Sequence, residues 1–263
     1  MNLITLSPWD LGWAALAVLV LAAISLREGL GIERTLLVAA VRMAVQLILV
    51  GYVLKALFTT VNPWLIGALA LAMVGMAGYE VRARLKRKLV GPWGRWLATG
   101  PLFLSSFAVT LFALLAVVGA EPWYHPRYAI PLLGMMLGNG MSGVALVLNH
   151  LLATVPARRD EIEQRLMLGE TRDQAMHDIR REAMHAATIP LINAMTAAGI
   201  ISLPGVMTGQ ILAGAPPVEA VRFQLLIMFL IAAGSGFAQV MALKLTVARL
   251  FDARGRLRLD RMG

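Results

Sequence analysis

The sequence contains no cysteine, which excludes disulfides, thiolate metal ligands and cysteine catalysis. Charged residues are scarce, at 15% of 263 residues, whereas 59% of the residues are hydrophobic. A soluble domain rarely reaches that balance, and several apolar runs approach the roughly 20 residues with which a helix spans a bilayer. The first 26 residues hold no Lys or Arg, so we do not expect the basic start of a cleaved signal peptide. These absences predict an all-α, polytopic membrane protein.

The motifs of common enzyme classes are also missing. The sequence has no G-x-x-x-x-G-K-[ST] phosphate loop, no HExxH pair and no Ser/His/Asp arrangement within a predicted span. We therefore expect no catalytic residue and no cofactor bound by this chain, so that any ATP–Mg it depends on is held by a partner. The four histidines do not converge, and the spans lack an Asp/Glu/His cluster. Which residues would ligate a metal is unknown from the sequence.

The apolar runs predict seven membrane-spanning helices in a single transmembrane domain over residues 1–263. The predicted spans are about 9–26, 36–58, 62–81, 97–119, 130–153, 188–213 and 223–249. The net charge of +9 does not indicate a nucleic-acid partner, because Lys and Arg cluster in every second connection, beside the apolar runs. The positive-inside rule then places the N-terminus outside and the C-terminus in the cytoplasm.

The longest polar segment, residues 156–187, carries six arginines and seven acidic residues. A loop that only adheres to anionic lipid would be mostly basic. Apolar residues recur at helical spacings on both sides of Leu168-Gly169, which indicates two short helices joined by a turn. This pattern fits a cytoplasmic docking surface for a soluble protein, and equally an ordinary solvated loop.

Two predicted spans share the pattern Gly-x-Met-x-Gly-amide. It covers residues 134–139 in the fifth span and 205–210 in the sixth, both in the outer half of the membrane. The paired glycines permit close helix approach, and Pro204 can kink or open the sixth span. Broken helices often build a transporter's substrate site. The alternative is a packing motif in which methionines fill gaps.

If a metal is the cargo, these two stretches offer oxygen and sulfur ligands. The oxygens belong to Asn139, Thr208 and Gln210, and the sulfurs to Met136 and Met207. Thioethers suit Cu(I), whereas Fe(II) prefers nitrogen and oxygen. We expect the cargo to be bound weakly, or as a complex.

Two stretches resemble ABC-transporter permeases. Glu163 precedes Gly169 by six residues, which looks like the coupling-loop signature in which a Gly separates two short helices that enter a cleft on the ATPase. The downstream Pro of that signature is absent, since Glu182 stands at its position and Pro190 follows eight residues later. Residues 137–149 and 189–224, with LPGVMTGQILAG as the most distinctive piece, are similar to the bacterial iron-export ABC permease family, whose plant relatives are linked to aluminium tolerance.

This resemblance covers nearly the whole chain and implies a permease of the bacterial inner membrane. Such a permease would form a homodimer in the lipid bilayer, pair with a separate cytoplasmic ABC ATPase, and export iron or a related metal. The implied ATPase contacts are Glu163, Leu166, Leu168, Gly169 and Ala175. The expected substrate pathway comprises Met136, Gly138, Asn139, Met141, Pro204, Gly205, Met207, Thr208, Gly209 and Gln210.

Two other functions remain open at this point. An ion-gradient-driven secondary metal transporter would need an acidic residue inside a span, and none is well placed. A membrane scaffold without transport activity would use the polar segment to bind some other protein.

Overall fold

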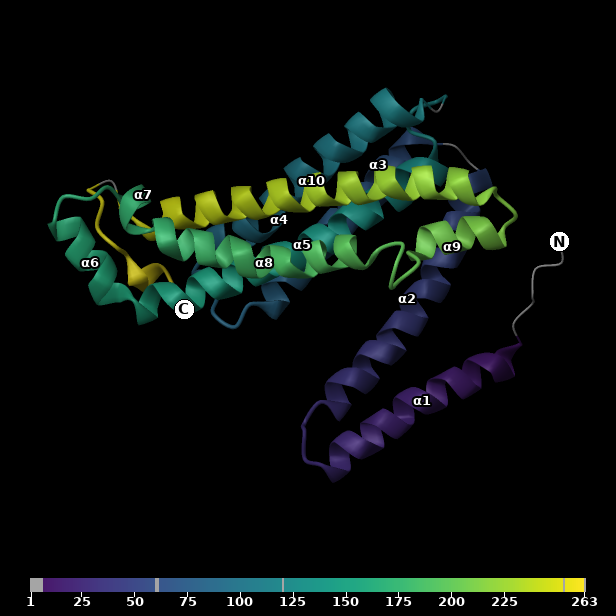
Figure 1. The fold of residues 1–263 in the computed structure, drawn as a ribbon, viewed down its shortest axis with the longest axis horizontal. Coiled ribbons are helices and arrows are strands. Elements are labelled where there is room, and N and C mark those ends of the chain that lie inside the picture. Colours follow the sequence, from purple (N-terminus) through teal and green to yellow (C-terminus); the bar gives the residue numbers. More distant parts are fainter. Residues whose placement is uncertain (1–6, 60–61, 120, 253, 263) are drawn as a thin grey trace. The chain divides into compact units, whose positions relative to one another are not determined.

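The computed structural model describes residues 7–59, 62–119, 121–252 and 254–262. In these residues the regular structure is helical, apart from three isolated β-bridges. The elements, labelled in Figure 1, are α1 (Pro8–Arg27), α2 (Glu33–Thr59), α3 (Pro63–Arg84), α4 (Trp93–Phe112), the π-helix η1 (Ala113–Val118), α5 (Pro126–Ala157), α6 (Arg159–Met167), α7 (Arg172–Ala175), α8 (His177–Ala197), α9 (Gly205–Leu212), α10 (Pro217–Leu250) and the 3-10 helix η2 (Leu259–Arg261). The chain forms two compact units, residues 1–62 with 212–214, and residues 63–211 with 215–263.

In the first unit, α1 and α2 form a hairpin. α1 begins with a capping box in which the Ser7 backbone N–H donates to the Asp10 carboxylate over 2.8 Å. Near the turn between the helices, the buried Ser25 hydroxyl donates to the Glu33 carboxylate, also over 2.8 Å. This bond joins the last turns of α1 to the first turn of α2.

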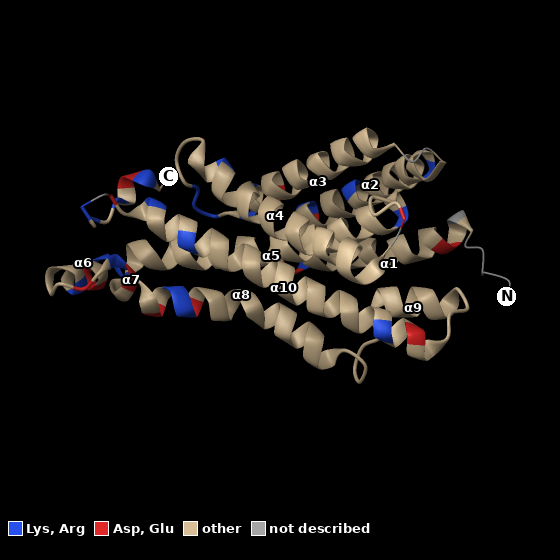
Figure 2. Ribbon diagram, turned by 90° about the horizontal axis from the view of Figure 1, so that it is seen from above, with Lys and Arg blue, Asp and Glu red and all other residues tan. Residues whose placement is uncertain are grey.

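In the second unit, most charged residues lie at the end of the bundle that carries α6, α7 and the C-terminal segment (Figure 2). The basic loop between α3 and α4 lies at this end as well, because the Val90 N–H donates to the Arg261 carbonyl over 3.0 Å. Asn149, near the end of α5, accepts from the Lys86 N–H and donates to the Arg84 carbonyl. Three segments predicted to be cytoplasmic therefore share one end of the bundle, while their orientation in the membrane stays a prediction.

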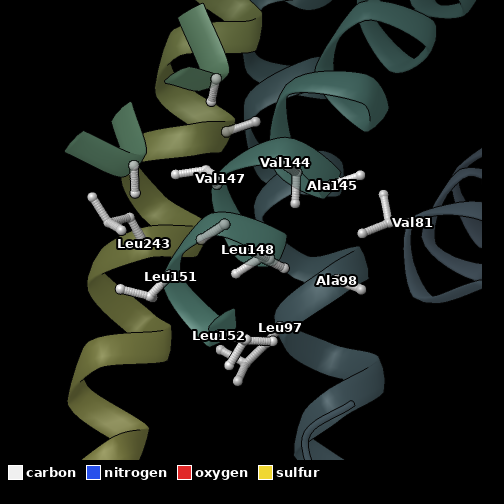
Figure 3. Packing of buried hydrophobic residues seen from close by; sticks show 14 of the residues in the cluster. Val81, Leu97, Ala98, Val144, Ala145, Val147, Leu148, Leu151, Leu152 and Leu243 are labelled. Atoms are coloured by element: carbon white, nitrogen blue, oxygen red, sulfur yellow. The ribbon is translucent and has the colours of Figure 1, made fainter. Parts of the chain in front are cut away.

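α5 is the central helix of the second unit and packs against α3, α4, α8 and α10. Figure 3 shows Leu148, Leu151 and Leu152 of α5 in one cluster with Leu97 of α4 and Leu243 of α10. Helical spacing of large apolar residues along α5 gives it several buried faces, as expected of a helix enclosed by others. The core of this unit therefore fixes the positions of α5, α8 and α10 relative to one another.

α3 and α4 approach closely at one glycine. A Cβ added at Gly78 would lie 2.0 Å from the Thr99 Oγ1 and 2.8 Å from the Thr99 Cβ, so only glycine fits there. Gly67 and Gly75, also in α3, have no such neighbour within 4 Å. α3 therefore packs closely against α4 at Gly78.

The described helices match six of the seven predicted spans. Six of them, α1, α2, α3, α4 with η1, α5 and α10, are long and apolar enough to cross a membrane. The seventh predicted span, 188–213, is an interrupted helix, because α8 ends at Ala197 and α9 begins only at Gly205. The chain is a multi-pass helical membrane protein.

Candidate functional site

The polar segment 156–187 folds into two short helices followed by the start of a longer one. α6 ends at Met167, α7 begins at Arg172, and α8 begins at His177. Gly169 lies between α6 and α7 with a φ of 91°, a backbone conformation that glycine adopts without steric cost. The predicted turn at Leu168-Gly169 is confirmed.

Local hydrogen bonds fix this turn on both sides. The Gly169 N–H donates to the Leu166 carbonyl over 3.1 Å and ends α6. Thr171 and Gln174 then form a capping box, in which the Thr171 N–H donates to the Gln174 side-chain oxygen over 2.8 Å. The turn is therefore a defined structure with paired backbone groups.

The segment has a buried base and an exposed apolar tip. Ile162, Met176 and Ile179 are buried in the main core of the second unit. By contrast, Met167 and Leu168, at the end of α6, are 79% and 85% exposed. These two exposed apolar side chains, on a turn whose base is packed in the core, form a candidate docking surface. We call residues 167–168 the docking tip.

Ion pairs join the short helices to α8. Arg165 lies 2.8 Å from Asp178, and Arg180 lies 2.9 Å from Asp173. The pKa of the Asp178 carboxyl is lowered because it accepts hydrogen bonds from His177 and from Arg165. Arginines and acids of this segment thus pair with each other both within one helix and between helices.

The five residues predicted to contact an ATPase occupy different environments. Glu163 pairs with Arg159 over 2.8 Å, while Leu166 packs partly against the core. Ala175 is buried. Leu168 and Gly169 are exposed. The neighbouring Met167 was not singled out from the sequence, where it looks like any apolar residue of a helix.

The chain leaves helical geometry between α8 and α9. Gly199 has a φ of 88°, and its N–H donates to the Ser202 carbonyl over 2.9 Å. Pro204 stands directly before α9, whose residues 205–210 are the second Gly-x-Met-x-Gly-amide stretch. The opening of this span that Pro204 predicts is confirmed, and it extends over residues 198–204.

Residues of both Gly-x-Met-x-Gly-amide stretches contribute to one core cluster. Met136 of α5 is 1% exposed and belongs to the cluster, against which Val206 of α9 packs. Met141 packs instead against the main core. Met207, Thr208 and Gln210 are half-buried, and Gly138, Gly205 and Gly209 are exposed. Their role in a substrate pathway stays a prediction.

Asn139 does line a cavity, together with polar residues that the sequence did not single out. The cavity has a volume of about 130 Å³ and lies between α5, α8 and α10. Its polar side chains are Asn139, Ser142, Ser235 and Gln239. Near it, a Cβ on Gly143 would lie 2.2 Å from the Gln239 Nε2, so glycine lets α10 approach α5 here. Sequence reading missed Ser235 and Gln239 because isolated polar residues in an apolar helix give no signal of what they face.

No preformed cluster of acidic or histidine ligands occurs in the described residues. Among them, no three His, Asp or Glu side chains lie close enough to hold a metal ion together.

Comparisons with known proteins cover most of the chain. Residues 8–251 match the model of a family described as "Uncharacterised protein family (UPF0014)". The UPF0014 membrane protein slr1647 of Synechocystis is 40% identical over 233 residues, which are 87% of this chain and 88% of the relative. The "Probable iron export permease protein FetB" of Escherichia coli is 31% identical over 262 residues, covering 98% of this chain and 97% of the relative. The protein ALUMINUM SENSITIVE 3 of Arabidopsis thaliana is 35% identical over 217 residues, 82% of this chain and 77% of the relative. No solved structure gives a significant match.

Proposed function

Because this chain belongs to the UPF0014 family of membrane proteins, we propose that it is the permease subunit of an ABC transporter. The proposed cargo is iron or a related metal, moved outward across the bacterial inner membrane. ATP–Mg is bound and hydrolysed by a separate cytoplasmic ATPase subunit, and two copies of the permease assemble with two ATPases. The name of the Escherichia coli relative supports the cargo and the permease role.

The docking tip, residues 167–168, is the observation that carries this proposal. Removing a Leu or Met side chain from water contributes about 1.5–3 kcal/mol each, so a partner with an apolar cleft gains from covering the tip. The buried base and the ion pairs to α8 hold the tip in place before binding, which lowers the entropic cost of association.

The same segment gives a physical route from the tip to the membrane. α6 follows α5 directly at Arg158, and α7 runs into α8 at Met176. α5 and α8 in turn line the cavity that contains Asn139. In the proposed mechanism, closure of the ATPase subunits displaces the tip, and α5 and α8 carry that displacement to the cavity.

Replacing Gly169 by Val tests whether the geometry of the turn matters. Val at a φ of 91° is strained by roughly 1–2 kcal/mol, so the turn rearranges and presents Met167 and Leu168 wrongly. We expect the permease to co-purify with an ABC ATPase subunit from the same organism and to stimulate its ATP hydrolysis. We expect G169V to lose most of that stimulation.

Gly91 provides the matched control. It has a φ of 81°, lies in the loop between α3 and α4, and has no neighbour within 4 Å of an added Cβ, so Gly91→Val introduces similar strain elsewhere. Equal ATPase stimulation by G169V, G91V and the unchanged chain would count against the proposed coupling. Absence of any stimulation by the unchanged chain would count against the ABC assignment.

A further inference from the structure

The connection between α3 and α4 carries positive charge that nothing in its own sequence balances. Residues 82–96 include six Lys and Arg residues and no Asp or Glu. Three of the six, Lys86, Arg87 and Lys88, are consecutive and exposed, and we call them the basic triplet. In the described residues no ion pair includes a side chain of the triplet, whereas arginines of residues 156–187, at the same end of the bundle, are paired with acids.

The backbone of the basic triplet is held firmly by its surroundings. Leu85 and Leu89, which flank the triplet, are buried in the main core. The Lys86 backbone N–H donates to the Asn149 Oδ1 over 2.9 Å. A Cβ on Gly94 would lie 2.5 Å from the Leu89 carbonyl oxygen, so the connection packs directly on the first turn of α4. Because the triplet is in place before a partner arrives, ordering it costs little on binding.

The basic triplet lies at the level of lipid headgroups. α3 has 22 residues and is roughly 33 Å long, close to the roughly 30 Å of the hydrocarbon core, so Arg84 at its end lies near the edge of that core. Two residues separate Arg84 from Lys86 and span at most roughly 7 Å, which is about the thickness of the polar layer on one side of a bilayer. Trp93 and Trp96, at the start of α4, are 49% and 57% exposed, as is typical of indole rings at this depth.

We propose that the basic triplet binds the headgroup of an anionic phospholipid. Lys and Arg side chains donate charge-assisted hydrogen bonds to phosphate oxygens, and each such residue near an anionic membrane surface strengthens binding about fivefold. A zwitterionic headgroup gains less, because its own cation is repelled by the triplet. The positive-inside rule accounts for the sign of the charge here, but it does not require three fixed side chains without acidic partners.

Native mass spectrometry of the purified full-length permease in detergent, without any ATPase, tests this site. The chain is mixed with equal amounts of phosphatidylglycerol and phosphatidylcholine that have identical acyl chains. We expect the unchanged chain to retain at least about four times more phosphatidylglycerol, and the triple variant Lys86→Gln, Arg87→Gln, Lys88→Gln to keep a preference below about 1.5-fold. The preference of the unchanged chain should also fall as the salt concentration rises from about 0.1 M to about 0.5 M.

A second triple variant, Arg254→Gln, Arg256→Gln, Arg258→Gln, is the matched control. It removes the same charge from the C-terminal segment at the same end of the bundle, where Arg256 is paired with Asp252 and Arg258 with Asp260. This variant should keep a preference of at least about threefold, because the basic triplet is intact.

Three results would overturn the site. The first is equal retention of the two lipids by the unchanged chain, and the second is equal loss of preference in the two triple variants, which would mean attraction to the net charge of this end. The third is displacement of phosphatidylglycerol by about 10 mM soluble glycerol phosphate, which would indicate a site for soluble anions, since a lipid is also held by its acyl chains.

Thermal unfolding shows whether the triple variant is folded, and its midpoint should stay unchanged because the three side chains are exposed. If the midpoint falls, Lys88→Gln alone replaces the triple variant and should lose about half of the preference, and full preference in that variant would then reject the site. ATPase stimulation does not enter these measurements, so their outcome is independent of the proposed ABC function.

Discussion

Replacing Leu168 by Asp should reduce ATPase stimulation by about tenfold to a hundredfold while the permease stays folded. Leu168 is 85% exposed, so the free permease loses no packing when its side chain changes. The free energy of binding to the ATPase would lose the roughly 1.5–3 kcal/mol that burial of one Leu contributes. Burial of a carboxylate at the same place would weaken binding further. The measurement is ATP hydrolysis at saturating ATP, with the reconstituted pair in proteoliposomes.

Val218→Asp is the control for this substitution. Val218 is 64% exposed in the first turn of α10, where a carboxylate is favourable beside the helix N-terminus. The V218D variant should stimulate the ATPase as the unchanged chain does. If L168D also kept full stimulation, the tip would not be the docking surface.

Replacing Gly78 by Ala should destabilise the second unit by about 2 kcal/mol, as overpacking of a closely packed contact does. The added Cβ would lie 2.8 Å from the Thr99 Cβ, which no side-chain rotation can move, so α3 and α4 must separate. Gly75→Ala, in the same helix with no neighbour within 4 Å, should be neutral or stabilising by up to about 1 kcal/mol.

Thermal unfolding followed by size-exclusion chromatography in detergent compares these two variants. The double variant with Gly78→Ala and Thr99→Gly should recover most of the loss, because Thr99→Gly removes the obstructing Cβ. Equal midpoints for Gly78→Ala and Gly75→Ala would mean that the helices do not meet at Gly78.

Sequence patterns predicted the helices better than their contacts. Six apolar runs became six long helices, because hydropathy over about 20 residues is a property of the segment itself. The run 188–213 stays apolar through Ile200 and Ile201, so hydropathy gave no reason to interrupt it. The residues that indicate the interruption are Gly199, which has a positive φ, and Pro204, which directly precedes α9.

The features of the candidate site could be predicted less well, because most of them depend on tertiary structure. The turn at Gly169 could be predicted because glycine at the end of a helix is a local signal. The burial of Ala175 and the exposure of Met167 could not be predicted, since both depend on which side of the α6–α7 pair faces the bundle. The contact between Gln239 of α10 and Gly143 of α5 could not be predicted either, because the two residues are more than ninety positions apart in the chain.

The most direct test of the central claim is ATP-dependent transport in inside-out vesicles that contain this permease and an ABC ATPase subunit from the same organism. Export from the cell becomes uptake in such vesicles. The account predicts that radioactive Fe²⁺ accumulates only with ATP and both subunits, and that L168D abolishes the accumulation. Fe²⁺ uptake that needs no ATPase and collapses with a protonophore would contradict it, as would uptake of copper with none of iron.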